Sequence, residues 1–284
     1  MLRKIKEDSM VFFRYPQLFP LCFAVFVSML GFGLVMPILP IYARDFGATG
    51  SQLGLLTASF AIARLITTFP GGWLADRAGR KKPIILGLLA YSVVMALYGL
   101  SQDTNQLIIL RGLQGLASGI VWPIISTMVV EMVLPVDRSK SMGLYEMMHF
   151  LGLVVGPSLG GVLAEVFNIA IPFFVCGTLA LLSSLLVAFT VQETHTEKSR
   201  EAAQFRTSDP QIDRKGITKA VKELTPFVGV FIGLCLARFI LAFSNSLMQP
   251  VLSVYAHEEI GISEAGIGIL FTVQAIATLL VTIP

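Results

Sequence analysis

Five ionisable side chains lie inside long apolar runs of this chain, and they are the first candidates for chemistry. They are Arg64, Arg111, Arg238, Glu146 and His149. A charge in an apolar medium is costly, so such residues are usually kept because they bind a substrate or move a proton. Glu146 and His149 are one helical turn apart, and both can titrate near neutral pH once they are buried. We therefore predict that they carry protons, with packing or gating as the alternative.

The three arginines outnumber the single deeply placed acid, so a cavity that they line would be positive. Such a cavity could hold an anionic substrate or favour the ionised form of Glu146. Structural salt bridges or snorkelling toward the membrane surface are the alternative roles. Apolar and polar side chains that could line the same cavity, or else face lipid or pack in the core, are Phe26, Phe32, Met36, Tyr145, Met147, Met148, Phe239, Phe243, Asn245 and Gln249.

The elements that must position these residues are membrane-spanning helices. Of the 284 residues, 55% are apolar and 14% are charged, which excludes a soluble globular protein, a disordered chain and a disulfide scaffold. A span needs about 20 apolar residues. We predict an all-α membrane protein, and its eight candidate spans are 17–43, 51–75, 83–101, 105–132, 141–164, 168–192, 225–255 and 264–284.

The positions of lysine and arginine predict the orientation. With the N-terminus inside, 17 of the 21 fall on the cytoplasmic side and one, Arg44, outside. Because positive residues concentrate in cytoplasmic loops, we expect a multi-pass inner-membrane protein with a cytoplasmic N-terminus. The polar segment 193–224 would then be a cytoplasmic linker between a six-helix bundle, 1–192, and a partial second bundle, 225–284. Residues 212–223 could form an amphipathic helix on the inner membrane surface.

The chain also contains an internal repeat. Residues 36–70 align with 249–284, with one inserted residue near Gly261. Paired positions include Pro37 with Pro250, Tyr42 with Tyr255 and Gly47 with Gly261. Since six spans and a linker separate the copies, both enter the membrane in the same sense, as in transporters built from parallel repeats. We therefore expect a piece of a protein of about twelve spans that does not transport by itself; a complete eight-span protein is the alternative.

Four motifs resemble those of the major facilitator superfamily, and in particular of its drug:proton antiporters. The loop GGWLADRAGRKK (71–82) resembles the family's loop signature, and RGLQG, which starts at Arg111, resembles its fourth-span motif. GLVVGPSLGG (152–161) and GFGLVMPILP (31–40) resemble fifth-span and first-span motifs. The resemblance implies a helical bundle of this type, a complete six-helix half followed by the first two helices of the other. It also implies alternating access, with Arg111 linked to proton coupling.

The loop signature has a physical interpretation. Asp76 follows the inner end of the second span, where the negative helix end repels it unless a cation compensates. We expect such a cluster to latch the inner side and to break when the halves rock, whereas plain positive-inside anchoring is the alternative. The residues assigned to this inner gate are Gly72, Asp76, Arg77, Gly79, Arg80, Lys81 and Glu131.

Glycines in the fifth span form a second structural signal. Gly152, Gly156 and Gly160 recur every four residues and leave a groove that lets another helix approach closely, while Pro157 bends the helix. Together with Gly161 they are predicted to form a pivot against the second half, with generic glycine packing as the alternative.

These features predict export of small amphipathic or drug-like molecules, in exchange for protons. Proton-coupled uptake of a metabolite or organic anion is the rival, and a non-transporting sensor or scaffold is the alternative from another class. We expect no enzyme activity, cofactor or metal site, because no nucleophile–base set occurs and the three cysteines lie singly in apolar runs. Cys22, Cys176 and Cys235 are therefore predicted to be small buried apolar residues. The expected partners are the substrate, protons and the lipid bilayer. We expect no nucleic acid partner, and we expect a monomer.

Overall fold

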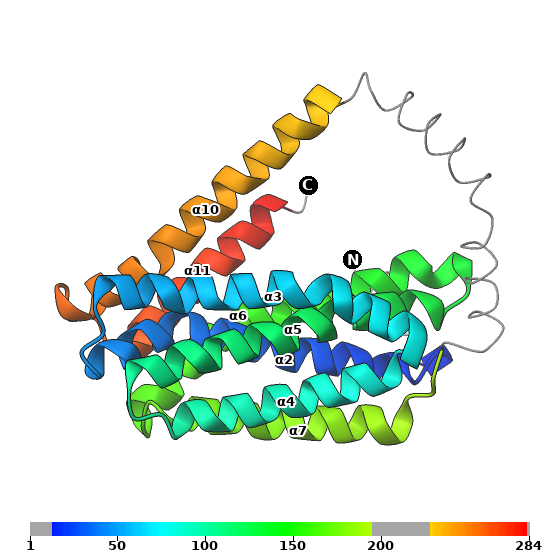
Figure 1. Ribbon diagram of the computed structural model, residues 1–284, viewed down its shortest axis with the longest axis horizontal. Helices are drawn as coiled ribbons and strands as arrows, with labels where there is room; N and C mark the ends of the chain where they lie inside the picture. Colours follow the sequence, from blue (N-terminus) through cyan, green and yellow to red (C-terminus); the bar gives the residue numbers. More distant parts are fainter. Residues whose placement is uncertain (1–12, 195–227, 283–284) are drawn as a thin grey trace. The chain divides into compact units, whose positions relative to one another are not determined.

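The computed structural model describes residues 13–194 and 228–282, with side chains to residue 278, and these residues form helices without any strand (Figure 1). Seven of the helices are long and apolar enough to cross a membrane. The eighth apolar helix, α11, is described with its side chains only as far as Thr278, and over that range it is shorter than the other seven. The elements are α2 (Leu18–Asp45), α3 (Gly50–Ala78), α4 (Lys81–Gly99), α5 (Thr104–Glu131), the 3-10 helix η1 (Pro135–Asp137), α6 (Arg138–Val166), α7 (Ile171–Thr190), α10 (Val228–Glu258) and α11 (Glu264–Thr282).

The predicted all-α membrane fold is confirmed. Each of the eight predicted spans coincides with a helix whose described ends differ from the prediction by three residues or fewer. The start of the seventh span lies outside the described residues. So do the amphipathic helix expected at 212–223 and the linker beyond Thr194.

The chain forms two compact units. One contains residues 13–194 together with 250–282, and the described part of the other is the first part of α10, residues 228–249. This part of α10 is described by itself, and its side chains are exposed almost throughout. Cys235 lies there and is exposed, so the predicted burial is wrong for it, because its helix has no packing neighbour among the described residues of its own unit. Cys22 and Cys176 are buried as expected.

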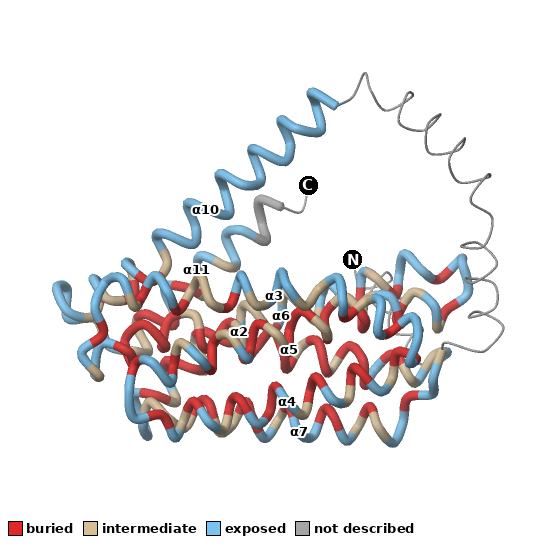
Figure 2. The backbone as a smooth tube through the Cα atoms, viewed as in Figure 1, coloured by how far each residue is buried: buried red, intermediate tan, exposed pale blue. Residues whose placement is uncertain are grey.

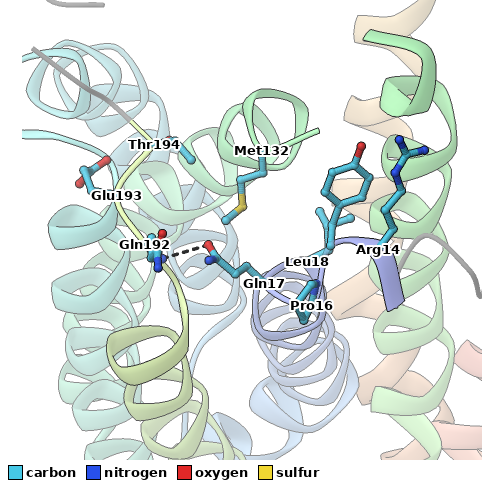
Figure 3. Close-up of a pocket in the computed structure, with 9 residues that line it drawn as sticks. Arg14, Pro16, Gln17, Leu18, Met132, Gln192, Glu193 and Thr194 are labelled. Carbon is cyan, nitrogen blue, oxygen red and sulfur yellow. Dashed lines mark hydrogen bonds between the residues drawn. The ribbon is translucent and has the colours of Figure 1, made fainter. Parts of the chain in front are cut away.

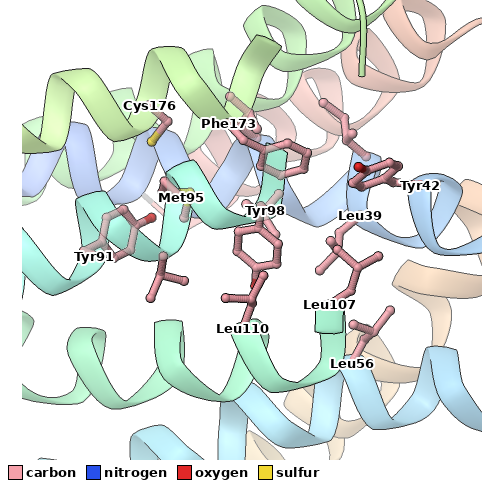
Figure 4. Close-up of a cluster of buried hydrophobic side chains, with 14 of the residues drawn as sticks. Leu39, Tyr42, Leu56, Tyr91, Met95, Tyr98, Leu107, Leu110, Phe173 and Cys176 are labelled. Carbon is pink, nitrogen blue, oxygen red and sulfur yellow. The ribbon is translucent and has the colours of Figure 1, made fainter. Parts of the chain in front are cut away.

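Helix α2 is the centre of the larger unit and is buried along most of its length (Figure 2). It packs against α6 and α7, while α4 packs against α5 and α7, and α3 against α5. Aromatic side chains fill the space between α2, α4 and α7 (Figure 4): the rings of Tyr98 and Phe173 stack 5.3 Å apart, and those of Tyr42 and Phe173 6.0 Å apart. This core holds α4 and α5 in place beside α2.

The glycines of α6 let it approach the backbone of α2. A Cβ atom at Gly156 would lie 2.5 Å from the carbonyl oxygen of Leu30 and 3.0 Å from the amide nitrogen of Leu34. Gly152 meets the backbone of Phe26 one turn earlier, so the groove faces the first bundle. This corrects the prediction that Gly152, Gly156 and Gly160 face the second half, because they sit on the side of α6 that α2 fills.

The neighbouring face of α6 packs against α11. A Cβ atom at Gly161 would collide with the carbonyl group of Glu264, and one at Gly268 with the carbonyl group of Pro157. Helix α6 is therefore in backbone contact with α2 on one side and with α11, the second helix of the repeat, on the other. A pivoting role for Pro157 and Gly161 stays a prediction.

The two copies of the repeat end in the same way. Helices α2 and α10 both contain a proline, Pro37 and Pro250, and each is followed by a left-handed glycine, Gly47 at φ 75° and Gly261 at φ 74°. The carbonyl of Ala43 accepts a hydrogen bond from the amide of residue 48, and that of Ala256 accepts one from residue 262. The second turn is thus one residue longer, as the inserted residue requires.

We predict that Gly156→Ala destabilises the bundle, because the added methyl group has only the backbone of α2 to displace. Overpacking of this kind costs about 1–3 kcal/mol of the free energy of unfolding. The matched control is Gly143→Ala on the same helix, where a Cβ atom has nothing within 4 Å. Thermal unfolding of the purified protein should show a lower Tm for Gly156→Ala only; equal Tm values for both variants would contradict the contact.

Candidate functional site

Three of the predicted gate residues meet at the end of the bundle that carries residues 71–82, here called the loop end. The guanidinium of Arg80 lies 2.6 Å from a carboxylate oxygen of Glu131 and 3.7 Å from one of Asp76. The Arg80 side chain is 9% exposed, whereas that of Asp76 is 67% exposed. Arg80 therefore joins the end of α5 to the end of α3, and the pair with Glu131 is the stronger of the two, being shorter and less hydrated.

Glu193, just after α7, is a member of this cluster that the sequence analysis missed. Its carboxylate accepts hydrogen bonds from the backbone amides of Arg80, at 2.9 Å, and Lys81, at 3.0 Å. These amides open α4, where the helix dipole favours an anion. The carboxylate occupies the place where a Cβ atom of Gly79 would stand, and Gly79 has a φ of 91°. Glu193 could have been found from the sequence, because it is an acid directly after an apolar run, on the same side of the membrane as residues 71–82.

The remaining gate residues have other neighbours. The Arg77 guanidinium stacks over the ring of Trp73 at 4.0 Å, and Gly72 has open space around its Cα. In the described residues, every partner of Arg80 comes from the first bundle, so the cluster ties α3, α4, α5 and the end of α7 together. Its action as a latch between two halves stays a prediction.

A cavity of about 310 Å³ adjoins the loop end (Figure 3). Its wall includes Glu193 and residues 14–17, which precede α2. The backbone amide of Gln192 donates a hydrogen bond to the side chain of Gln17 at 3.1 Å. Beside it, Asp137 accepts hydrogen bonds from Arg14 at 3.1 Å and from Tyr15 at 3.0 Å. The chain before α2 and the chain after α7 are thus held together at this end.

Arg111 lies deep within the bundle and has neutral partners. The guanidinium donates to the side-chain carbonyl of Gln114 at 2.7 Å, which also accepts from the hydroxyl of Tyr98 at 3.1 Å. The amide of Gln114 donates to Tyr91, whose hydroxyl donates to the carbonyl of Ser28. This network links α5 to α4 and α2. No described carboxylate lies within ion-pairing distance of Arg111, so its charge has no counter-ion among the described residues.

A cluster of three rings, Phe32, Phe60 and Trp122, separates Arg111 from Arg64; we call it the aromatic wall. The ring of Phe32 lies 5.3 Å from Phe60 and 5.8 Å from Trp122. The Arg111 guanidinium lies 4.5 Å from the Phe60 ring, and that of Arg64 lies 4.3 Å from the Trp122 ring. Both are cation–π distances. The structure thus brings two of the three predicted arginines to one surface made by α2, α3 and α5.

His149 joins this surface and Glu146 does not. The His149 ring lies 6.4 Å from those of Trp122 and Tyr145, and its Nδ1 is buried with no hydrogen-bond partner among the described residues. Glu146 is exposed on α6, whereas its neighbour Tyr145 turns into the core; the depth of Glu146 in the membrane stays a prediction. A role of either residue in proton transfer stays a prediction.

The other candidate residues lie on α10. Arg238 and Asn245 are exposed, and Gln249 is half-buried, on the part of α10 that forms its own unit. Their participation in a shared cavity stays a prediction.

Contacts that the sequence analysis missed close the opposite end of the unit. We call this set of residues the far-end closure; it consists of Arg44, Glu258, Glu165 and the start of α11. Arg44 donates to both carboxylate oxygens of Glu258, each at 2.8 Å. Glu165 accepts from the amide of Ala265 at 3.1 Å. One carboxylate, Glu165, comes from α6 of the first bundle, and the other, Glu258, comes from the second copy of the repeat. The pairing of Arg44 with Glu258 could have been inferred from the sequence, because these opposite charges lie at the matching ends of the two repeated helices.

Comparison with known proteins places the chain among membrane carriers. The sequence model of the Major Facilitator Superfamily matches residues 21–233. The quinolone resistance protein NorA of Staphylococcus aureus (strain MRSA252) is 31% identical over 256 residues, which are 90% of this chain and 62% of that protein. Multidrug resistance protein 2 of Bacillus subtilis (strain 168) is 30% identical over 260 residues, 91% of this chain and 63% of that protein. The chain spans about three fifths of the length of these relatives.

Solved structures agree on the fold. A bacterial homolog of the human lysosomal transporter Spinster, in an inward-facing and unoccupied conformation, superposes with a TM-score of 0.77 at 19% identity over 94% of this chain and 61% of its own. The peptide transporter POT in complex with sulfate gives a TM-score of 0.64 at 18% identity, over 93% of this chain and 66% of its own. The predicted bundle type is confirmed, and the chain is a multi-pass membrane protein.

We predict that Gly79→Ala disrupts the loop end, whereas Gly72→Ala does not. At Gly79 an alanine would adopt a strained backbone, at a cost of about 1–3 kcal/mol, and would displace the Glu193 carboxylate. At Gly72 a Cβ atom meets nothing within 4 Å. The Tm of each purified variant measures the difference, and a Gly79→Ala protein as stable as Gly72→Ala would be evidence against the Glu193 contact.

We predict that Arg44→Glu loosens the far-end closure by placing two acids opposite each other. In a background without native cysteines, a cysteine replacing Ala256, which is 2% exposed, should react several-fold faster with a maleimide. Adding Glu258→Arg should restore slow labelling.

The control for this prediction is Lys140→Glu, the same reversal at an exposed residue of the other end. Unchanged labelling in Arg44→Glu would show that the ion pair does not hold this end closed.

Proposed function

The chain belongs to the major facilitator superfamily, and on that premise we propose that the protein exports small amphipathic, drug-like molecules in exchange for protons. The observation that carries the proposal is the similarity to NorA and to multidrug resistance protein 2, which extends over nine tenths of this chain. The names of both relatives describe resistance to drugs, and export is the most direct way in which a membrane carrier provides it.

The geometry of the site supports this assignment. Aromatic rings and two guanidinium groups gather at the aromatic wall, and Arg64 is exposed there; these side-chain types suit amphipathic ligands that have a ring and a polar group. In this proposal the substrate binds at the aromatic wall, and uptake of a proton by His149 or Glu146 shifts the equilibrium between inward-open and outward-open states. The Arg111 network holds α2, α4 and α5 together while the halves move.

The two ends of the bundle would act as alternating gates. The cluster around Arg80 is proposed to close the cytoplasmic end, and the far-end closure the external one. The excess of lysine and arginine on one side supports a cytoplasmic N-terminus and a place in the cell membrane. We further propose that the protein acts as a monomer.

Proton-coupled uptake of an organic anion is the second candidate. The specific observation in its favour is that neither Arg64 nor Arg111 has a carboxylate partner among the described residues, so an anion would be attracted to them. The direction of flux under a proton gradient separates the two candidates.

We predict that everted membrane vesicles containing the protein at its full natural length accumulate amphipathic drugs when their interior is made acidic. Arg111→Gln should slow this accumulation at least about tenfold, because a charge-assisted hydrogen bond and the network that depends on it are lost. Fluorescence of an added dye substrate measures the flux, with Arg138→Gln, an exposed arginine, as the control.

Two outcomes would count against export. If the same gradient instead empties preloaded vesicles, uptake is the correct function. If no compound of a broad panel moves in either direction while the protein is present and folded, the transport proposal fails.

A further inference from the structure

A histidine lies next to the far-end closure and takes no part in the contacts described so far. His257 directly precedes Glu258 at the end of α10, and it is half-buried. Its Nδ1 lies 3.1 Å from the carbonyl oxygen of Ile262. Because a carbonyl can only accept a hydrogen bond, Nδ1 carries the hydrogen, and Nε2 is the nitrogen that can take up a second proton. The contact thus fixes the tautomer of His257 and leaves one protonation step open to it.

Charged groups of four helices meet at this end of the unit. They are Arg44 and Asp45 of α2, Glu165 of α6, which is bound to an amide of α11, Glu258 of α10, Glu259 in the turn after it, and Glu264 of α11. The charge of His257 acts on the carboxylates of Asp45 and Glu258, and the charge of Glu264 acts on Asp45 as well. His257 therefore belongs to one electrostatic cluster that joins α2, α10 and α11.

The cluster holds more negative than positive charge. Arg44 and Glu258 form a bidentate pair, so their charges offset each other. Asp45 and Glu264 have no cation within ion-pairing distance among the described residues. These two like charges repel each other, so closing this end has an electrostatic cost. A proton on His257 would reduce that cost, because it adds a positive charge to the same cluster.

The acids around His257 differ in how they respond to opening of this end. Glu258 is the next residue on the same helix, so it remains a neighbour of His257 whether the end is open or closed. Asp45 lies on α2, in the first copy of the repeat, and comes near His257 only while the two copies are in contact. The attraction between Asp45 and a protonated His257 is therefore specific to the closed state, and only such a differential interaction can shift the equilibrium.

We propose that His257 is a proton-binding site that controls the far-end closure: the imidazolium holds this end closed, and the neutral imidazole lets it open. The proton comes from water at that end and adds to Nε2. This inference rests on the proposed alternation of the two gates and goes beyond the carried proton assigned to His149 or Glu146. In the proposed orientation this end faces the external medium, so an acidic medium favours the state that is closed to it.

Spin-label distances in the protein at its full natural length, in nanodiscs, test this proposal without any proton gradient. In a background without native cysteines, labelled cysteines replace Ser51 at the start of α3 and Ile260 in the turn after α10, both of which are exposed. Between about pH 6 and pH 8 an imidazole titrates, whereas ordinary carboxylates stay ionised. We expect the ratio of closed to open molecules to rise at least about threefold as the pH falls across this range. A ratio that stays constant or falls would overturn the proposal.

Variants locate the group that responds to pH. His257→Asn keeps an N–H donor for the carbonyl of Ile262 but cannot be protonated, so its ratio should not change with pH. Asp45→Asn keeps the histidine and removes the acid across the interface, so its response should be weaker. The matched control is His149→Asn, the same replacement within the bundle, which should keep the response.

A full response that persists in His257→Asn would show that another group binds the proton, and the assignment to His257 would be wrong. If that variant does not fold, a full response in Asp45→Asn would overturn the proposal. Failure of this inference is distinguishable from failure of the transport proposal. Closure that depends on His257 and pH, without gradient-driven flux, would contradict transport alone, and drug flux with closure independent of pH would contradict the role of His257 alone.

Discussion

The close approach of α2 and α6 is the constraint on which the rest of the bundle depends. Two helices can meet at backbone distance only where one lacks side chains, and Gly152 and Gly156 provide that surface opposite Leu30 and Leu34. Because α2 is central, this contact also fixes where α6 presents His149 and where α2 presents Phe32. The neighbouring face of α6 then contacts α11, because Gly161 of α6 and Gly268 of α11 let the two backbones approach closely. A single helix thereby connects the first bundle to the second helix of the repeat.

The polar groups inside this packing follow a consistent rule. Arg111 is surrounded by Gln114, Tyr98 and Tyr91, which offer dipoles but no opposite charge. The formal ion pairs of the described residues lie at the two ends, at Arg80 and Arg14 on one side and at Arg44 on the other. Attraction between opposite charges therefore acts at the ends of the helices. Among the described residues, the cations Arg64 and Arg111 have no carboxylate partner.

The helices could be predicted from sequence because membrane spans are long and uniformly apolar, so their ends are marked by polar residues. The repeat could be predicted because Pro37 and Pro250, and Gly47 and Gly261, hold the same conformational positions in both copies. The neighbouring helix that each individual residue faces could not be predicted in the same way. Gly152 and Gly161 occupy adjoining faces of one helix and meet different neighbours, which depends on how α6 is rotated. The roles of Trp122 and Glu193 were missed because they depend on neighbours more than 50 residues away, Arg64 and the amide of Arg80.

The attachment of Glu193 gives the segment that continues from α7 a mechanical role. Its carboxylate is fastened to the first amides of α4, and Thr194 beside it donates to Glu131, the partner of Arg80. Because the chain is covalently continuous, a force that acts on it after Thr194 is transmitted first to these few hydrogen bonds. The described end of the chain after α7 is therefore fixed to the same groups that hold the ends of α4 and α5 together.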